Sequence, residues 1–184
     1  MFKVINIEET PNPDALKFIL DQPLLVSGVR QFDNAPAGSK DPLARPLFSL
    51  GGVESVFYMG GFVTVAKFPN RAWDELKPQI VKVIEESAEA AKNAGDAPAG
   101  NGSSATPENG ELLTKINQVL EENVVPALAA DGGGIEVLGL DDYVLTIHYQ
   151  GACGSCASST AGTMMAVQNL LQRMIDPRIQ VVPG

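Results

Sequence analysis

The chain has 184 residues, of which 45% are hydrophobic and 19% are charged, a composition typical of one large or two small folded domains. Its 22 acidic and 13 basic side chains give a net charge of −9, which argues against binding to nucleic acid or to an anionic membrane surface. Two cysteines are too few to hold a secreted domain together, and no signal-peptide pattern opens the chain. We therefore expect a cytoplasmic protein with free thiols.

The first half of the chain predicts two strands, a short helix, a hairpin and a long helix. The strands are expected at residues 2–7 and 15–20, the short helix from Asp41 to Gly51, and the hairpin strands at 53–58 and 62–67. Asp41 followed by proline is typical of a helix N-terminus, and two glycines favour its end. Asn70 is the expected cap of the long helix, and Pro78 should bend that helix or delay its start.

A segment of small and turn-forming residues, 93–107, follows the first half. It contains no large apolar side chain that could anchor it, so we expect a flexible linker between two domains. Most of the acidity lies beyond residue 92: residues 1–92 hold 10 basic and 12 acidic groups, and residues 93–184 hold 3 and 10.

The second half predicts a helix over residues 110–130 with a kink at Pro126, a hairpin, a further helix and a short final strand. The hairpin strands are expected at 135–140 and 143–149, the helix at 157–174 and the strand at 179–182. Four apolar residues at helical spacing predict the core face of the last helix: Met164, Val167, Leu171 and Met174. The predicted fold class is α+β, with two small α/β-sandwich-type domains at 1–92 and 108–184 joined by the linker at 93–107.

Residues 143–172 contain no Asp, Glu, Lys or Arg, and both cysteines lie in this stretch. Frequent polar side chains make it a poor membrane span, so we expect no membrane partner. Cys153 and Cys156 lie three residues apart between a predicted strand and a predicted helix. The helix N-terminus favours anionic thiolates, which bind metals and attack disulfides.

The number of cysteines limits the kind of site. A structural zinc ion or an iron–sulfur cluster commonly needs four ligands, and this chain offers Cys153 and Cys156 alone. His148 is the one histidine, and strand alternation places it on the face opposite Leu145, Ile147 and Tyr149, so we expect a surface or interface residue. Two chains meeting at the cysteines would supply four thiolates, which predicts a homodimer around a shared cluster.

Two other functions remain open at this point. A CxxC pair at a helix start also suits a dithiol–disulfide oxidoreductase, although no aromatic residue precedes Cys153 and no thioredoxin-like βαβ pattern leads into it. A homodimer held by a structural zinc ion would use the same half-sites.

At these residues the sequence resembles the Nfu branch of the NifU family, which comprises iron–sulfur cluster scaffold and carrier proteins. The second half carries the resemblance in ValValProAlaLeuAlaAlaAspGlyGlyGly (124–134) and GlyAlaCysGlySerCysAlaSerSerThr (151–160). The first half carries it in GluThrProAsnProAspAlaLeuLysPhe (9–18), AspProLeuAlaArgProLeuPhe (41–48) and TrpAspGluLeuLysPro (73–78). The family usually has Ser-Gly between the cysteines and proline after them, whereas this chain has Gly-Ser and Ala157.

The resemblance implies a carrier protein rather than an enzyme, with Cys153 and Cys156 as the cofactor and metal ligands. A 4Fe-4S cluster, or a 2Fe-2S cluster, would be shared across a homodimer and passed to apo iron–sulfur proteins. The upstream partner would be the cluster assembly machinery, and the N-terminal domain would recognise partners. Nucleic acid and membranes are not expected partners.

Overall fold

The computed structural model describes residues 2–26, 28–94, 110–152 and 157–184. The chain divides into two compact units, Met1–Ala99 and Gly100–Gly184. Residues 95–109, which include most of the linker expected at 93–107, lie outside the described residues, as do Cys153 and Cys156. Among the described helices, none combines the length and apolar character needed to cross a bilayer.

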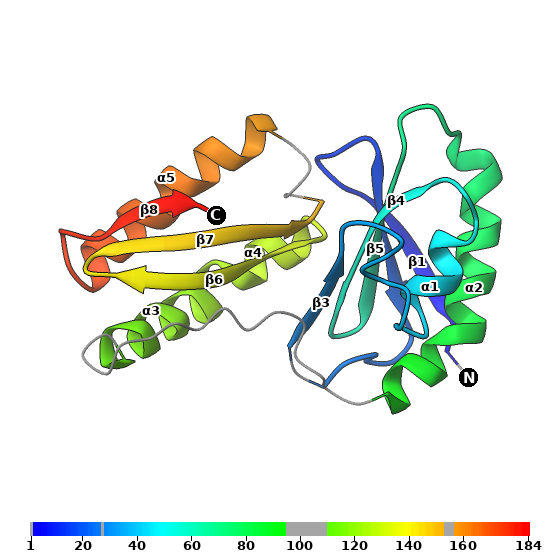
Figure 1. The fold of residues 1–184 in the computed structure, drawn as a ribbon, viewed down its shortest axis with the longest axis horizontal. Helices are drawn as coiled ribbons and strands as arrows, with labels where there is room; N and C mark the ends of the chain where they lie inside the picture. Colours follow the sequence, from blue (N-terminus) through cyan, green and yellow to red (C-terminus); the bar gives the residue numbers. More distant parts are fainter. Residues whose placement is uncertain (1, 27, 95–109, 153–156) are drawn as a thin grey trace. The chain divides into compact units, whose positions relative to one another are not determined.

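The N-terminal unit is an antiparallel five-stranded sheet with two helices on one face (Figure 1). Its elements are β1 (Val4–Glu9), β2 (Ala15–Leu20), β3 (Val29–Phe32), α1 (Ala44–Phe48), β4 (Val53–Met59), β5 (Phe62–Lys67) and α2 (Trp73–Asn93). The strand order is β1-β2-β5-β4-β3, so both strands of the β4–β5 hairpin lie inside the sheet. Alternate strand residues face the helices and form the core: Leu16, Phe18, Val56, Val63 and Val65 pack with Leu76, Ile80 and Ile84.

Three sequence expectations for this unit need correction. Strand β3 was not predicted. Its two central residues, Arg30 and Gln31, are both polar, so the segment has no apolar alternation, and its pairing with β4 depends on residues distant in the sequence. Asn70 is not the cap of α2, which begins at Trp73 after the extended residue Ala72 and has no side-chain cap. Pro78 does not delay α2, which runs without interruption past it, although proline removes one helical hydrogen bond.

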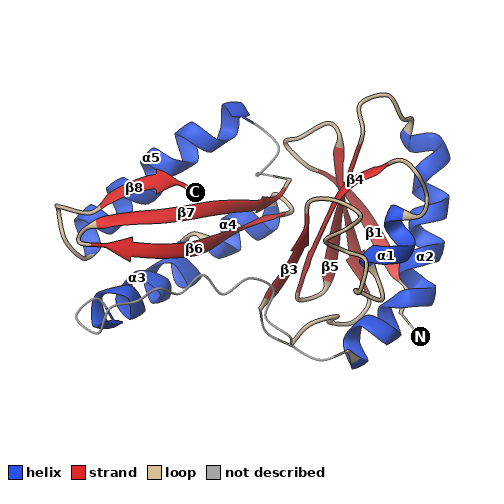
Figure 2. Ribbon diagram, in the orientation of Figure 1, coloured by secondary structure: helices blue, strands red, loops and turns tan. Residues whose placement is uncertain are grey.

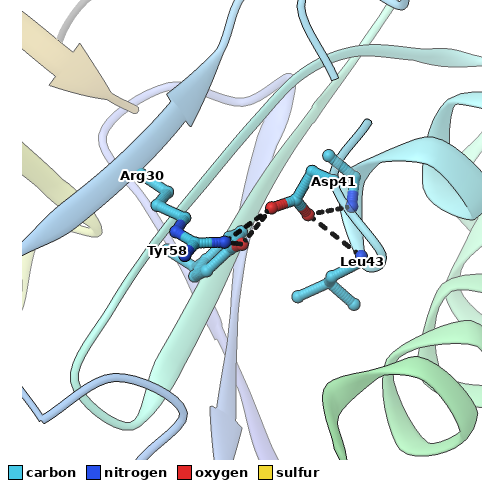
Figure 3. Close-up of polar contacts among 5 residues, drawn as sticks. Arg30, Asp41, Leu43 and Tyr58 are labelled. Atoms are coloured by element: carbon cyan, nitrogen blue, oxygen red, sulfur yellow. Dashed lines mark hydrogen bonds and ion pairs between the residues drawn. The ribbon is translucent and has the colours of Figure 1, made fainter. Parts of the chain in front are cut away.

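A buried ionic network ties β3 and β4 to the start of α1 (Figure 3). Asp41 Oδ2 accepts hydrogen bonds from Arg30 Nη1 at 2.9 Å and from the Tyr58 hydroxyl at 2.7 Å. Its Oδ1 accepts from the amides of Leu43 at 2.9 Å and Ala44 at 2.8 Å. Asp41 thus binds the amides at the start of α1, but the prediction that it is the N-cap was wrong, because the helix begins at Ala44 and its N-cap residue is Leu43.

The charges of this network shift the pKa values of its members. Burial and the neighbouring Asp41 carboxylate raise the pKa of Tyr58, which stays a neutral donor. Burial alone would lower the pKa of Arg30, but its hydrogen bonds to Tyr58 and Asp41 outweigh burial and raise it. The network thus contains one buried positive charge balanced by one buried negative charge.

The C-terminal unit is a three-stranded sheet packed against three helices (Figure 2). Its elements are α3 (Gly110–Asn123), α4 (Val125–Ala130), β6 (Gly133–Asp141), β7 (Val144–Gly151), α5 (Ala157–Met174) and β8 (Gln180–Pro183). The strand order is β6-β7-β8, with β6 antiparallel and β8 parallel to β7. Both units therefore confirm the predicted α+β class and its two α/β-sandwich-type domains.

The core of this unit confirms the alternation predicted for β7. Leu145, Ile147 and Tyr149 pack with residues of all three helices, namely Ile116, Leu120, Leu128, Val167 and Leu171. Two details differ from expectation. The predicted helix over 110–130 breaks at Val124 into α3 and α4, because Pro126 lacks the amide that would continue the first helix. Met174 is 55% exposed and is not a core residue, since Ile175 takes the packing position after the helix ends.

Candidate functional site

The cysteine motif lies between the end of β7 and the start of α5. Strand β7 ends at Gly151 and helix α5 begins at Ala157, so both flanking elements occur where the sequence predicts them. Cys153 and Cys156 themselves are outside the described residues. The described flanks are a strand before the motif and a helix N-terminus after it, the setting expected to favour thiolates.

Two glycines fix the direction in which the chain leaves the sheet. Gly151 has φ of 67°, a left-handed conformation that strains any other L-residue. The next amide, that of Ala152, donates a 3.3 Å hydrogen bond to the carbonyl of Gly132, and Ala152 is buried. Gly132 also has a positive φ, 75°, and follows the C-cap of α4. The sequence predicts this glycine run only as a helix stop, whereas the structure also uses it to anchor the start of the cysteine segment.

The described surroundings of the motif favour an anionic, sulfur-bound cargo. The first turn of α5 contains no acidic residue, so the partial positive charge of the helix N-terminus is not neutralised there. No charged residue occurs between residues 143 and 172. Burying this region against another surface would therefore strand no unpaired charge.

An exposed stretch of one α5 face, residues 162–169, carries no charge in the described part of the helix, and Arg173 follows on the same face one turn later. Gly162, Met165, Ala166 and Asn169 are all exposed, and their spacing of three, one and three residues puts them on one side of the helix. Met165 is 69% exposed, which is high for a large apolar side chain. The sequence analysis did not predict this face, because it considered only the apolar core stripe of the helix, which includes the neighbouring Met164 and not Met165.

Polar residues gather on the sheet surface that leads to the motif. Glu136 on β6 and His148 on β7 are direct cross-strand neighbours. Gln150 Nε2 donates a 2.7 Å hydrogen bond to Glu136 Oε2, and His148 Nδ1 lies 3.3 Å from the backbone oxygen of Gly184. His148 lies on the face opposite the core, as predicted. Among the described residues, no three His, Cys, Asp or Glu side chains form a metal-binding group.

Two family models match the chain and together account for both units. The model described as scaffold protein Nfu/NifU N terminal matches residues 5–91. The model described as NifU-like domain matches residues 116–182, which include the cysteine motif. The chain belongs to the Nfu/NifU scaffold family. The resemblance expected from the sequence motifs is thereby confirmed.

Named relatives agree with this family assignment. The chain is 32% identical over 182 residues to the human NFU1 iron-sulfur cluster scaffold homolog, mitochondrial, covering 98% of this chain and 71% of the relative. It is 32% identical over 177 residues to the Arabidopsis thaliana NifU-like protein 5, mitochondrial, covering 94% of this chain and 64% of that relative. The chain thus spans about two thirds of the length of these relatives, all of which are named as scaffold or NifU-like proteins.

A solved structure also resembles part of the chain. The solution NMR structure of the NifU-like protein from Saccharomyces cerevisiae aligns with a TM-score of 0.43 and 24% sequence identity, covering 50% of this chain and 81% of that one. At this level of likeness, the family rests on the sequence matches rather than on the superposition.

The expected cytoplasmic location is contradicted by the relatives. The human protein and two Arabidopsis thaliana proteins are all named mitochondrial. The expectation was wrong because it rested on the lack of a targeting pattern, which by itself does not specify a compartment.

Proposed function

We propose that this chain carries an iron–sulfur cluster as cargo, held by Cys153 and Cys156 of two copies, and delivers it to apo-proteins. The observation that carries this proposal is the position of the CxxC pair between β7 and α5 in a domain matched by the NifU-like model. The cargo is a 4Fe-4S cluster, with 2Fe-2S as the alternative. Each chain brings two thiols, and four thiolates complete the ligand set of such a cluster.

The described flanks of the motif fit such a cargo. Gly151 and Gly132 direct the chain where it leaves the sheet, through left-handed φ values that glycine adopts without strain and through the Ala152 hydrogen bond. A rigid exit restricts where the two thiolates can lie relative to the start of α5. The helix N-terminus and the absence of acidic residues in its first turn both favour the negative charge of a thiolate-bound cluster.

The exposed face of α5 supports a second copy of this chain as the partner that completes the site. Met165 lies about two turns after the start of the helix that follows the cysteines, and the residues beside it on that face are small or uncharged. Two such faces can pack over residues 162–169 without burying a charge, with Arg173 one turn beyond them. The cluster and the exposed faces would together hold the dimer, so we expect the cluster-free chain to associate more weakly.

Delivery then requires ligand exchange and no catalytic turnover. Thiolates of the recipient replace Cys153 and Cys156 on iron one at a time, in the way that thiolates exchange at other accessible centres. The chain acts in this proposal as a carrier and not as an enzyme. The family matches lend no support to the dithiol–disulfide oxidoreductase alternative.

The N-terminal unit recruits recipients in this proposal. Residues 93–107 act as a tether that keeps a bound recipient at a high effective concentration near the cluster. Deleting residues 1–92 should slow delivery to some recipients and leave cluster binding intact. Loss of cluster binding in the shortened chain would contradict this division of roles.

Anaerobic reconstitution with iron and sulfide tests the central proposal. The full chain should gain brown colour, iron and sulfide in equal amounts, and the mass of a dimer, and the Cys153→Ser and Cys156→Ser variants should stay colourless. Reduction of insulin by a colourless monomer would favour an oxidoreductase instead. A colourless dimer that contains zinc would favour the structural zinc site.

Two variants of α5 test the position of the dimer seam. Met165→Lys would place a charge on the exposed face near the cysteines, where burying it is unfavourable, and should reduce dimer formation and cluster retention. Met174→Lys makes the same change at a residue that is also exposed, 55%, but at the far end of the helix, and should have little effect. Equal retention of the cluster by both variants would place the seam elsewhere.

A further inference from the structure

Three polar side chains share the outer surface of the β6–β7 pair, on the side away from the helices. Glu136 and His148 are opposite each other in the strand register, and Gln150 lies two residues further along β7 on the same face. Directly opposed side chains start from Cβ atoms about 5 Å apart, which brings their ends within reach of one ion. These residues are distinct from the cysteine pair of the proposed cluster site.

The hydrogen bonding of Gln150 leaves one buried acceptor unsatisfied. Gln150 is 4% exposed, and its Nε2 donates to Glu136 Oε2 at 2.7 Å. Its Oε1 is buried and has no donor among the described residues. Exchanging the two ends of the amide would not help, because Oε1 would then face the carboxylate oxygen. A buried oxygen without a partner is unfavourable unless something binds it.

One ring nitrogen of His148, Nδ1, contacts a backbone oxygen, and the other, Nε2, is available to bind a cation. Nδ1 lies 3.3 Å from the backbone oxygen of Gly184, and because a carbonyl oxygen can only accept, a hydrogen bond there assigns the proton to Nδ1. The lone pair then lies on Nε2. Histidines that bind metals commonly donate their other ring nitrogen to a backbone oxygen or a carboxylate in this way.

We propose that Glu136, His148 and Gln150 bind one divalent first-row transition cation of the Fe²⁺ type. The set offers a carboxylate oxygen, an imidazole nitrogen and an amide oxygen, and water molecules complete the coordination. A cation would give Gln150 Oε1 its missing partner. Burial raises the pKa of Glu136, so the carboxylate is held in an environment where a positive charge stabilises its ionised form.

Cobalt titration of a cysteine-free chain tests this site independently of the cluster. The full-length chain with Cys153→Ser and Cys156→Ser, free of any purification tag, is titrated with Co²⁺. Because His148 is the one histidine of the chain, its imidazole proton signals in NMR spectra report directly on cation binding. Failure of cluster reconstitution would leave this measurement unaffected, since the thiols are already absent.

We expect the His148 signals to shift with saturation at one Co²⁺ per chain. Glu136→Gln keeps the size of the side chain and an acceptor for Gln150, and it should weaken Co²⁺ binding about tenfold or more. His148→Gln should weaken it similarly, measured by calorimetry. Glu121→Gln removes a charge from an exposed residue of α3 in the same unit and should leave affinity unchanged. Unshifted His148 signals, or equal affinity in Glu136→Gln and Glu121→Gln, would overturn the proposal.

Discussion

Replacing Asp41 with asparagine should strongly destabilise the N-terminal unit, because it removes the counter-charge of a buried arginine. The side chains of Arg30 and Asp41 are 8% and 4% exposed. Asparagine can keep the two amide hydrogen bonds of Leu43 and Ala44 through its Oδ1. Its NH₂ group, however, would face Arg30 Nη1 and the Tyr58 hydroxyl, which both now donate hydrogen bonds to Asp41 Oδ2.

The size of the effect follows from the burial of the pair. Removing one partner of a buried ion pair leaves the other charge uncompensated, which lowers the free energy of unfolding by about 3–5 kcal/mol. Domains are typically stable by about 5–15 kcal/mol, so this is a large share of the total. With a typical urea dependence, the unfolding midpoint should fall by roughly 2 M.

Urea denaturation followed by tryptophan fluorescence measures this loss in the intact chain. Trp73 is the one tryptophan and packs on the core of the N-terminal unit, so its emission reports on that unit alone. Asp33→Asn makes the same chemical change at an exposed residue nearby and should shift the midpoint little. Adding Arg30→Met to Asp41→Asn should restore part of the loss, because no unpaired charge then remains. Equal midpoints for Asp41→Asn and Asp33→Asn would refute this reasoning.

Three further predictions concern the C-terminal unit. Folding raises the pKa of Glu136 above 4.5, so the contribution of this group to stability is present below pH 4.5 and is lost as pH rises. The metal-free Glu136→Gln variant should therefore have a higher melting temperature than the parent at pH 7 and the same melting temperature at pH 3.5. A higher melting temperature of the variant at pH 3.5 would contradict this. Gly151→Ala should destabilise the cluster-free chain by about 1–2 kcal/mol, because its φ is 67°. Gly162→Ala, in α5 with open space around it, should stabilise the cluster-free chain by about 0.5–1 kcal/mol in the same melting experiment. A Gly151→Ala variant more stable than the Gly162→Ala variant would be inconsistent with the structure.

Much of the candidate site could be predicted from local sequence patterns. The alternation of Leu145, Ile147 and Tyr149 defines β7, and the cysteine spacing between a strand and a helix indicates ligand chemistry. Those features depend on residues close in the chain, where periodicity and turn chemistry act directly. The roles of Cys153 and Cys156 remain predictions, since both lie outside the described residues.

The sequence by itself determined the α+β class, most helices and strands, and the family, because each depends on local periodicity or on a contiguous motif. Only the tertiary structure decided that Arg30 and Tyr58 meet Asp41, and that Glu136 lies opposite His148. It also decided that the carbonyl of Gly132 holds the amide of Ala152, and that Met174 faces solvent. These contacts join residues brought together by strand pairing and helix packing, and no local pattern specifies which distant residue will be the partner.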